Sequence, residues 1–380
     1  MIATTAAVSR AGASGFVVEE LSVETPRADE VIVRFLAAGL CRTDLEVAAG
    51  RLPTPLPVVS GHEGAGVVEY VGSGVEGFAV GDRVIAGFNF CGCCANCRGG
   101  MPAYCPDHFA LNFGAQRADG SVGLSDQNGR PVHDHFFGQS SFAGLSLCRP
   151  SGLVRVKEDI PASVLAPLGC GVSTGVGAVW NVLKAEPGVT LLVIGAGAVG
   201  LSAVMAAVAS GAGRIIVADR HTARLDLAVQ LGATDVVDVT TSPPVDAVME
   251  LTGGAGVGLA LESTGSPESM TAAVGALAPL GRAAILGIAP PQAEFRTDAF
   301  ELLLGRSVMG SVIGHQAPAV LIPRILRLYR QGRFPIERLT TLYPLESIND
   351  AVADVEAGVT VKAVLQHRHD QEQKEYPSGR

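Results

Sequence analysis

The sequence predicts an α/β protein with two domains: a β-rich domain that carries two groups of cysteines, and a domain built on a doubly wound parallel sheet. Short β-branched runs separated by Gly and Pro fill the first part of the chain, and strand–helix units follow up to about residue 312. The length of 380 residues is sufficient for two such domains.

The composition is that of a folded globular protein, and it excludes several classes of partner. Hydrophobic residues make up 48% of the chain and charged residues 17%. A net charge of −9, without a basic stripe, argues against binding to a nucleic-acid backbone. Eight cysteines are too few for a disulfide scaffold, and the first residues lack the charged start and apolar run of a signal peptide. We therefore expect a cytoplasmic protein with no nucleic-acid and no membrane partner.

The first domain is expected to extend over residues 1–171 and to consist of antiparallel strands. The segments 30–35, 66–72 and 81–87 are short β-branched runs among Gly and Pro residues. Frequent glycines keep such strands short, so the sequence predicts a compact β domain with many turns.

One candidate metal site lies in this domain. His62 and Glu63 stand side by side among glycines, Cys41 lies upstream, and Cys170 lies far downstream. A His-Glu pair alone would more often be a satisfied surface pair, but two cysteines change that interpretation. Two thiolates and one imidazole leave the fourth position of a tetrahedral zinc open to water or substrate, which is typical of a catalytic site.

A second group of cysteines has the spacing C-x2-C-x2-C-x7-C. Four thiolates at these spacings fit a closed, structural zinc site, because neighbours this close cannot all form unstrained disulfides. An iron–sulfur cluster and a loop with chance cysteines are the alternatives. Cys93 is an additional cysteine inside the group, and Cys148 is expected to be an ordinary packed thiol. The four expected ligands are Cys91, Cys94, Cys97 and Cys105.

Residues 106–150 are expected to form mainly loops. Asp119-Gly120 and Asn128-Gly129 are turn signals. His133 and His135 have no cysteine beside them, so we interpret them as strand or loop residues and not as metal ligands.

The second domain is expected over residues 172–312 and opens with a nucleotide-binding pattern. The uncharged stretch 189–213 is long enough to cross a bilayer, but it reads as a strand, the turn Gly195-Ala196-Gly197-Ala198-Val199-Gly200 and a helix. In such a turn, Gly195 permits the tight bend, Gly197 lets the backbone approach a pyrophosphate, and Gly200 lets helix pack on strand.

The next strand, 214–219, ends in Asp219 at the spacing expected for a residue that binds the adenosine ribose. A carboxylate there accepts hydrogen bonds from ribose hydroxyls and repels a 2′-phosphate, which favours NAD over NADP. Arg220 and Arg224 lie nearby, and their positive charges would favour the 2′-phosphate of NADP. Strands at 259–265 and 283–288 end in small residues, where the nicotinamide is expected.

After residue 313 the chain is expected to return to the first domain. The segment 319–330 reads as a helix and 361–365 as a strand, and the polar residues 367–380 are expected to be a loose tail.

Together these motifs resemble the zinc-dependent medium-chain alcohol dehydrogenases, members of the medium-chain dehydrogenase/reductase family, over essentially the whole chain. The matching pieces are Cys41-Arg42-Thr43-Asp44, Gly61-His62-Glu63, the four-cysteine group, the segment 169–175 and the glycine turn. Within that family, the segment 138–143 after Phe136-Phe137 is most similar to the aryl-alcohol (benzyl-alcohol) dehydrogenase branch, whose relatives include geraniol dehydrogenase.

The resemblance implies a GroES-like β-rich catalytic domain with a zinc lobe, a Rossmann domain, and roles for individual residues. It makes Cys41, His62 and Cys170 the catalytic zinc ligands, with Glu63 and Asp44 as nearby support, Thr43 as first proton acceptor, and Phe136, Phe137 and Leu52 in the substrate pocket. It places Arg42 and Lys362 at the pyrophosphate, Asp219, Arg220 and Arg224 around the ribose, and Thr174, Gly195, Gly197, Val199, Gly200, Ser263, Leu286, Gly287 and Ile288 along the dinucleotide.

The implied activity is the NAD-dependent interconversion of primary aromatic or allylic and terpene alcohols with their aldehydes, by a homodimer or homotetramer holding two Zn²⁺ per chain. Where several members have a histidine at the end of a proton relay, this chain has Glu46, so Glu46 or water ends the relay. A thiol-dependent formaldehyde dehydrogenase, acting on a glutathione or mycothiol adduct, is the enzymatic alternative. A zinc-ribbon nucleic-acid module and a non-enzymatic use of the fold are the alternatives from other classes.

Overall fold

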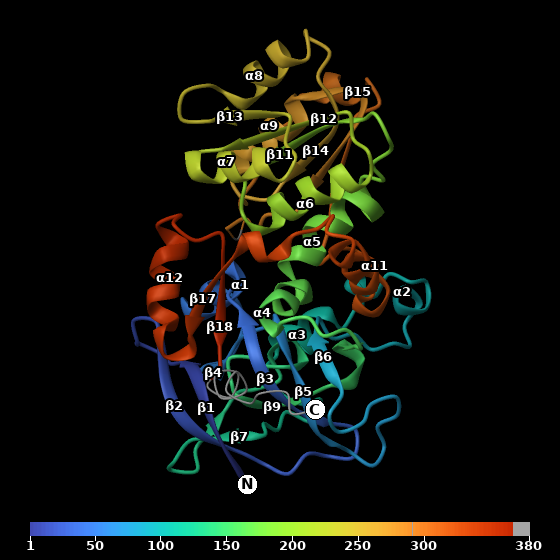
Figure 1. Cartoon of the computed structure of the whole chain (residues 1–380). Helices are drawn as coiled ribbons and strands as arrows, with labels where there is room; N and C mark the ends of the chain where they lie inside the picture. Colours follow the sequence, from blue (N-terminus) through green and yellow to red (C-terminus); the bar gives the residue numbers. More distant parts are fainter. Residues whose placement is uncertain (291, 368–380) are drawn as a thin grey trace, which may run out of the picture. The chain divides into compact units, whose positions relative to one another are not determined.

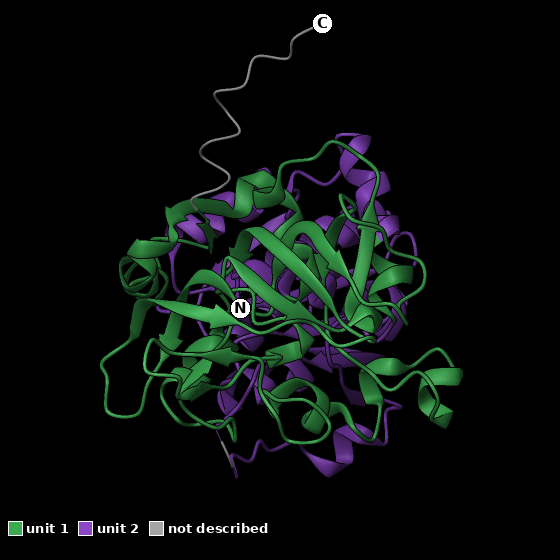
Figure 2. Ribbon diagram, turned by 90° about the horizontal axis from the view of Figure 1, so that it is seen from below, with its two compact units in different colours: residues 1–170, 317–322, 337–380 green, residues 171–316, 323–336 purple. Residues whose placement is uncertain are grey.

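The computed structural model describes residues 1–290 and 292–367. By its internal contacts the chain divides into two compact units, coloured separately in Figure 2. Unit 1 comprises residues 1–170, 317–322 and 337–380, and unit 2 comprises residues 171–316 and 323–336. The predicted domain boundaries stay a prediction, because compactness does not show which segments fold independently.

Unit 1 is built on two sheets of short strands (Figure 1). The smaller sheet is antiparallel, in the order β4-β1-β2-β7-β8. In the larger sheet the order is β10-β6-β5-β3-β18-β17, with β9 also paired to β3. The strands of the smaller sheet are β1 (Ile2–Ser9), β2 (Phe16–Val23), β4 (Val58–Val59), β7 (Leu124–Ser125) and β8 (Pro131–Val132). Those of the larger sheet are β3 (Val31–Gly39), β5 (Gly64–Val71), β6 (Arg83–Ala86), β9 (Leu145–Cys148), β10 (Leu153–Val156), β17 (Thr340–Pro344) and β18 (Lys362–Gln366).

Short helices connect these strands. The segment 106–150, expected to be loops, contains the helix α3, which the sequence pattern did not reveal because it is only 6 residues long. The helical segments of unit 1 are α1 (Arg42–Ala48), α2 (Ala95–Arg98), η1 (Pro102–Tyr104), α3 (His108–Phe113), η2 (Phe136–Gly138), η3 (Pro150–Gly152), α4 (Ala162–Leu165), η4 (Ala166–Gly169), η7 (Leu345–Ser347) and α12 (Ile348–Glu356). Two further segments, α11 (Pro318–Arg330) and η6 (Ile336–Leu339), contain residues of both units.

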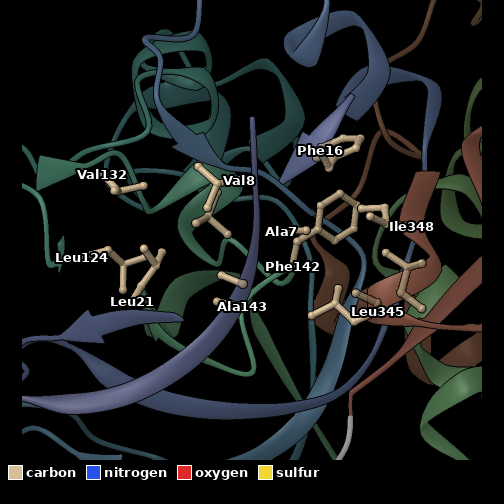
Figure 3. Packing of buried hydrophobic residues seen from close by; sticks show 14 of the residues in the cluster. Ala7, Val8, Phe16, Leu21, Leu124, Val132, Phe142, Ala143, Leu345 and Ile348 are labelled. Atoms are coloured by element: carbon tan, nitrogen blue, oxygen red, sulfur yellow. The ribbon is translucent and has the colours of Figure 1, made fainter. Parts of the chain in front are cut away.

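The core of unit 1 joins residues from both ends of the chain. Figure 3 shows Phe16 and Phe142 beside Leu345 and Ile348, and the two phenylalanine rings meet edge to face at 5.7 Å. Each of these side chains is almost completely buried, so the cluster gains the full hydrophobic contribution of its apolar surface.

The C-terminal end of the described chain corrects one expectation. His367, which the sequence places in a loose tail, is buried: its main-chain N–H donates to the Leu36 carbonyl, and its Nε2 lies 3.0 Å from the Ser141 carbonyl. Pairing of β18 with β3 carries the chain inward to this residue. The rest of the expected tail, 368–380, lies outside the described residues.

Unit 2 is a parallel sheet in the order β13-β12-β11-β14-β15-β16, flanked by helices (Figure 1). This is the doubly wound arrangement that alternating strands and helices predict. Its strands are β11 (Thr190–Ile194), β12 (Arg214–Asp219), β13 (Asp235–Asp238), β14 (Val257–Glu262), β15 (Leu277–Ile285) and β16 (Ser307–Gly310). Its helices are α5 (Gly171–Gly177), the π-type turn η5 (Ala178–Val182), α6 (Ala198–Ala209), α7 (Thr222–Gln230), α8 (Pro244–Leu251), α9 (Pro267–Gly275) and α10 (Ala299–Leu302).

Within the described residues, no single helix has the length and hydrophobicity needed to span a membrane, although the bent pair 162–169 and 171–182 would meet those two criteria together.

Candidate active site

Strand pairing brings the first candidate ligands together. β3 and β5 are antiparallel neighbours, and Ala38 at the end of β3 pairs with Gly64 at the start of β5. Cys41 lies two residues after the end of β3, and His62 and Glu63 directly precede β5, so this register places them at the same edge of the sheet. Two segments far apart in sequence thus form one site.

Cys170 completes the group from the end of η4. Gly169 allows this approach, because a Cβ there would collide with the Ala86 carbonyl and lie 3.3 Å from Glu63 Cα. One ligand atom from each of Cys41, His62, Glu63 and Cys170 lies within 4.8 Å of the others. Two sulfurs, one imidazole and one carboxylate therefore surround a single point inside unit 1.

The Cys41 thiol is the more acidic of the two thiols in this group. Cys170 hydrogen-bonds to Cys41, and this bond lowers the pKa of the Cys41 thiol well below its ordinary value while it raises that of Cys170. The His62 imidazolium and the Lys362 ammonium further favour the Cys41 thiolate. A buried thiolate needs positive charge beside it, which a divalent cation supplies better than a proton.

His62 is oriented by one ring nitrogen and presents the other. Its Nδ1 lies 2.9 Å from Asp44 Oδ1, and Asp44 is itself fixed by the main-chain N–H groups of Gly61 and Cys41, each at 3.0 Å. The Nε2 atom is buried without a hydrogen-bond partner. Burial lowers the pKa of His62, but the Asp44 carboxylate and the Cys41 thiolate outweigh it and raise the pKa well above its ordinary value.

These observations fit a zinc ion. An orphaned buried imidazole nitrogen next to two cysteine sulfurs is the donor set of a three-ligand zinc site, and a carboxylate that orients the ligating histidine is its usual support.

Lys362 contacts this site through Glu63. Its Nζ lies 2.9 Å from Glu63 Oε1 and donates to the Leu40 carbonyl at 3.0 Å, and both side chains are almost fully buried. Burial raises the pKa of Glu63 to about 7, against the effect of Lys362. The structure thus pairs Lys362 with Glu63, and its expected role at a pyrophosphate stays a prediction.

The start of α1 carries the other predicted side chains near Cys41. Thr43 is buried, with its hydroxyl 3.9 Å from Cys41 Sγ. Arg42 is exposed and forms an ion pair with Glu46 at 2.8 Å, and Arg51 binds the same carboxylate. The hydrogen bond from Arg51 lowers the pKa of Glu46, with help from Arg42. Glu46 is therefore a weaker base than an isolated glutamate, the reverse of what a proton relay requires.

The four-cysteine group is assembled in the lobe around α2 and η1. The sulfurs of Cys91, Cys94, Cys97 and Cys105 lie within 4.8 Å of one another. Cys91 and Cys97 are 3.8 Å apart, close to the separation of about 3.8 Å that a tetrahedral site with Zn–S bonds of about 2.3 Å requires. Main-chain N–H groups of Cys94 and Cys97 donate to the preceding cluster sulfurs at 3.4 Å. Cys93 is exposed and is not one of the four.

Aromatic rings line one side of His62. The Phe137 ring lies 4.6 Å from the imidazole at an angle of 30°, and the Phe136 ring meets it edge to face at 5.7 Å. Phe113 packs on both phenylalanines. Phe136 and Phe137 are buried, whereas Leu52 is only partly buried.

A buried ionic network beside these rings is absent from the sequence-based expectations. His135 bonds Asp134 through Nδ1 at 2.7 Å and Glu30 through Nε2 at 3.1 Å. Arg117 binds both oxygens of Glu30 and also pairs with Glu24. His135 lies in a loop, as expected, and the expectation that it holds no metal stays a prediction. No local pattern in the sequence indicates these ionic partners.

In unit 2 the glycine turn has the geometry expected of each glycine. Gly195 has φ +97°, which disfavours any side chain. A Cβ on Gly200 would collide with the Gly195 carbonyl, so only glycine lets α6 pack this closely. The space around Gly197 is open, with no atom within 4 Å of an added Cβ. Val199 lies in the first turn of α6, whose N-terminus can receive a phosphate.

Asp219 ends β12 and is tied to that turn. Its Oδ2 accepts the Ala196 N–H at 2.6 Å, and its Oδ1 accepts the His221 N–H and faces His221 Nδ1, both at 2.9 Å. Burial raises the pKa of Asp219, but these hydrogen bonds outweigh it and lower the pKa. Arg224 is half-buried near Asp219, and Arg220 is exposed.

The remaining predicted cofactor residues lie on neighbouring strand ends, apart from Thr174, which is buried in α5. Ser263 Oγ lies 3.1 Å from the Ile194 and Gly195 carbonyls. Leu286, Gly287 and Ile288 follow β15. Glu262, which the sequence analysis did not single out, is buried, and its Oε1 accepts the N–H groups of Thr264 and Gly265.

A parallel-sheet nucleotide fold together with this donor set defines a zinc-binding dehydrogenase, and comparisons with known proteins agree. Residues 27–127 match the model of the alcohol dehydrogenase GroES-like domain, and residues 198–327 match that of the zinc-binding dehydrogenases. The chain is 40% identical over 366 residues to a geraniol dehydrogenase from Castellaniella defragrans, covering 96% of this chain and 98% of that protein.

Two solved structures are also similar. The benzyl alcohol dehydrogenase from Acinetobacter calcoaceticus has 42% identity and a TM-score of 0.93, covering 97% of this chain and 100% of that one. An alcohol dehydrogenase zinc-binding domain protein from Burkholderia ambifaria has 47% identity and a TM-score of 0.94, covering 96% and 99%. The chain belongs to the zinc-dependent medium-chain alcohol dehydrogenase family, with relatives in its aryl-alcohol branch, and is an oxidoreductase. The expected family, fold class and enzyme class are thereby confirmed.

Proposed function

We propose that this protein is an NAD-dependent zinc alcohol dehydrogenase that interconverts primary aromatic or allylic and terpene alcohols with their aldehydes. The main support is that ligand atoms of Cys41, His62, Glu63 and Cys170 lie close together in unit 1. The Phe136 and Phe137 rings against His62 support a substrate with a flat, apolar group, as do the names of the two relatives above.

In this proposal Cys41, His62 and Cys170 hold the catalytic zinc. When bound, zinc supplies Lewis acidity toward the alcohol oxygen, and NAD accepts a hydride. Asp44 keeps the proton on His62 Nδ1, which leaves Nε2 as the donor atom. The Thr43 hydroxyl, buried near Cys41, accepts the alcohol proton and passes it outward. The buried rings exclude water from one side of the site.

The second zinc is assigned to Cys91, Cys94, Cys97 and Cys105, which gives two zinc ions per chain. NAD is preferred over NADP because the carboxylate of Asp219 would face a 2′-phosphate. Six of the eight cysteines are assigned to the two zinc sites, and their thiolates must stay reduced to bind metal, which supports a reducing, cytoplasmic location.

We further propose a homo-oligomer formed through the β16 edge of the unit 2 sheet. Within residues 1–290 and 292–367, β16 has a neighbouring strand on one side only, and large apolar side chains are exposed around it. Leu280, Phe300 and Leu303 are 79%, 70% and 79% exposed, and the Leu280 N–H donates to the Leu304 carbonyl, which places these segments side by side. An unpaired edge with an apolar border is a favourable surface for a second copy.

The substrate class is tested by NADH formation with purified, zinc-loaded protein. Two aromatic contacts of about 0.5–1.5 kcal/mol each should make kcat/KM for benzyl alcohol or geraniol about tenfold or more above that for ethanol. Ethanol as the better substrate would contradict the aromatic and allylic class. Turnover that requires glutathione or mycothiol with formaldehyde would instead support the thiol-dependent alternative.

A further inference from the structure

The segment 135–140 has an unusual backbone beside the candidate zinc ligand His62. Three non-glycine residues, His135, Phe137 and Ser140, have φ values of 60°, 52° and 49°, and Gly138 has φ 65°. Side chains disfavour this left-handed region, so surrounding contacts must hold the segment in place. Such concentrations of unfavourable backbone angles occur preferentially at functional sites.

The side chain of Gln139, inside this segment, makes several of the hydrogen bonds that hold the segment in place. Its side chain is 1% exposed. Its Oε1 accepts the Gly64 N–H at 3.0 Å, and its Nε2 donates to the carbonyls of His62 and Gly87 at 3.0 and 3.1 Å. Both amide protons and the amide oxygen are therefore used, and they join the start of β5, the residue after β6 and His62 itself.

The two residues that follow this segment bond to the two residues that precede His62. The Ser141 N–H donates to the Gly61 carbonyl at 2.9 Å, and the Phe142 N–H donates to that of Ser60 at 3.1 Å. Because Phe136 and Phe137 lie in the same segment and pack on the imidazole ring, any displacement of Gln139 moves His62 and the aromatic rings together.

We propose that Gln139 is a positioning residue: its side-chain amide fixes the His62 main chain relative to Phe136 and Phe137, and so sets both the metal affinity and the shape of the substrate pocket. This inference rests on the proposed function for the identity of the metal ligand. Asp44 orients His62 by its bond to the imidazole ring, and Gln139 holds His62 by its bond to the main-chain carbonyl.

The chemistry of the position requires an amide. A glutamate of the same length has no N–H to donate when ionised, so Gln139→Glu would leave the two carbonyls without donors and bury a charge. Gln139→Asn keeps both donors and the acceptor but is one methylene shorter. It changes the geometry without adding a charge, so it remains informative if the glutamate variant does not fold.

Asn112 offers a matched control. It is a buried amide that also accepts one main-chain bond, from the Asn89 N–H at 2.8 Å, and donates two, to the carbonyls of Asn89 and His108 at 3.0 and 2.8 Å. Within the described part of the chain, none of its hydrogen bonds reaches Cys41, His62, Glu63 or Cys170. Asn112→Asp should therefore lower thermal stability as the Gln139 variants do, without the effect on the metal.

The experiment titrates the metal-free full-length protein with Co²⁺, whose visible bands distinguish a site of two sulfurs and one nitrogen from a four-sulfur site. Gln139→Glu and Gln139→Asn should weaken Co²⁺ binding at the mixed site about 10–100-fold, the usual cost of losing a group that supports a metal ligand. Asn112→Asp should leave that affinity unchanged. In the zinc enzyme, the Gln139 variants should raise KM for benzyl alcohol more than KM for ethanol.

Folded Gln139→Asn protein with wild-type Co²⁺ affinity at the mixed site and an unchanged ratio of the two KM values would overturn the proposal. Equal weakening of the mixed site by Asn112→Asp would overturn it too, because the effect would then be general destabilisation. If the wild-type protein oxidised no alcohol but the Gln139 variants still weakened Co²⁺ binding, the proposed substrate class would fail and the positioning role would stand.

Discussion

The side chain of Glu46 illustrates how neighbours decide what a residue can do. Two arginines bind its carboxylate and lower its pKa, so it stays ionised and a poor proton acceptor near neutral pH. We expect Glu46→Gln to give a pH profile of kcat/KM that superimposes on that of the wild type, with water as the terminal acceptor. A loss of tenfold or more near pH 7 that small bases partly restore would show that Glu46 is the relay group after all.

We propose two roles for Asp219 at the glycine turn, and its replacement should affect both. Asp219→Ala removes the carboxylate that would oppose a 2′-phosphate, so the preference for NAD over NADP should fall about tenfold or more. It also removes the acceptor of the Ala196 N–H, so affinity for NAD should weaken. Side-by-side kinetics with both cofactors measure the two effects.

Asp238 provides the control for this change. It ends β13 in direct register with Asp219, and its Oδ1 accepts the N–H and the hydroxyl of Thr240. Asp238→Ala should leave the ratio of kcat/KM values for NAD and NADP unchanged. Wild-type protein that preferred NADP would contradict the assignment of Asp219 directly.

The helix α2 of the cysteine lobe has little hydrophobic contact to stabilise it. None of its four residues is buried, whereas Pro102 and Ala103 of η1 are, so bound metal should supply most of the stability of the part of the lobe around α2. Cys97→Ser should therefore release one zinc per chain and lower the thermal midpoint by several degrees or more. Elemental analysis and thermal unfolding check this.

Cys93, an exposed cysteine close to Cys97 in sequence, provides the matched control for Cys97→Ser. It lies in the same loop but outside the set of four, so Cys93→Ser should retain two zincs per chain and the wild-type midpoint. Equal behaviour of the two variants would show that the assignment of the ligands is wrong.

The segment that carries His135 should make stability depend on pH. Burial lowers the pKa of His135, but Asp134 and Glu30 outweigh it and raise the pKa to about 9, above the ordinary value of 6.5. Because the folded pKa is the higher one, this contribution is complete below about pH 6.5 and is lost as pH rises through about 9, with a size on the order of 3 kcal/mol. Arg117, which shares Glu30, keeps its charge throughout.

Denaturant unfolding between pH 6.5 and 9.5 tests this expectation. His135→Gln should be less stable than the wild type at pH 6.5 and should show a flatter dependence on pH. His133→Gln, two residues away and in contact with the Ala115 carbonyl, should keep the wild-type dependence. A wild-type protein equally stable across this range would exclude the charged form of His135.

Features set by residues close together in sequence could be predicted, and contacts between residues far apart in sequence could not. The Gly195 turn and the position of Asp219 are local patterns, and the two cysteine groups follow from ligand chemistry. By contrast, His135 and Arg117 meet Glu30 across 105 and 87 residues, and Lys362 meets Glu63 across 299. No local pattern encodes such partners, since strand order and register bring them together. The left-handed backbone angles of His135, Phe137, Gly138 and Ser140 could not be predicted from the sequence either, because three of these four residues are not glycine.

At the scale of the whole molecule, assembly should depend on the apolar border of β16. A charged side chain at this border would have to be buried between two copies, which is unfavourable, so Leu303→Asp should shift the protein toward monomers. Light scattering over a range of concentrations measures this. Val359→Asp, at a position that is 75% exposed in unit 1, is the control and should leave the molar mass unchanged. A wild-type monomer at all concentrations would contradict the proposed interface.

The place of β18 in the larger sheet also affects how the protein is made. β18 lies between β3 and β17, and it pairs residues 364–366 with residues 37–39. β3 leaves the ribosome long before β18, whereas all six strands of the parallel sheet emerge by residue 310. We therefore expect the second unit in sequence to reach its native state first, while nascent β3 waits with an open edge that chaperones or other nascent chains can occupy. A chain terminated before residue 362 would contain every cysteine of both clusters and still lack the strand that closes its sheet.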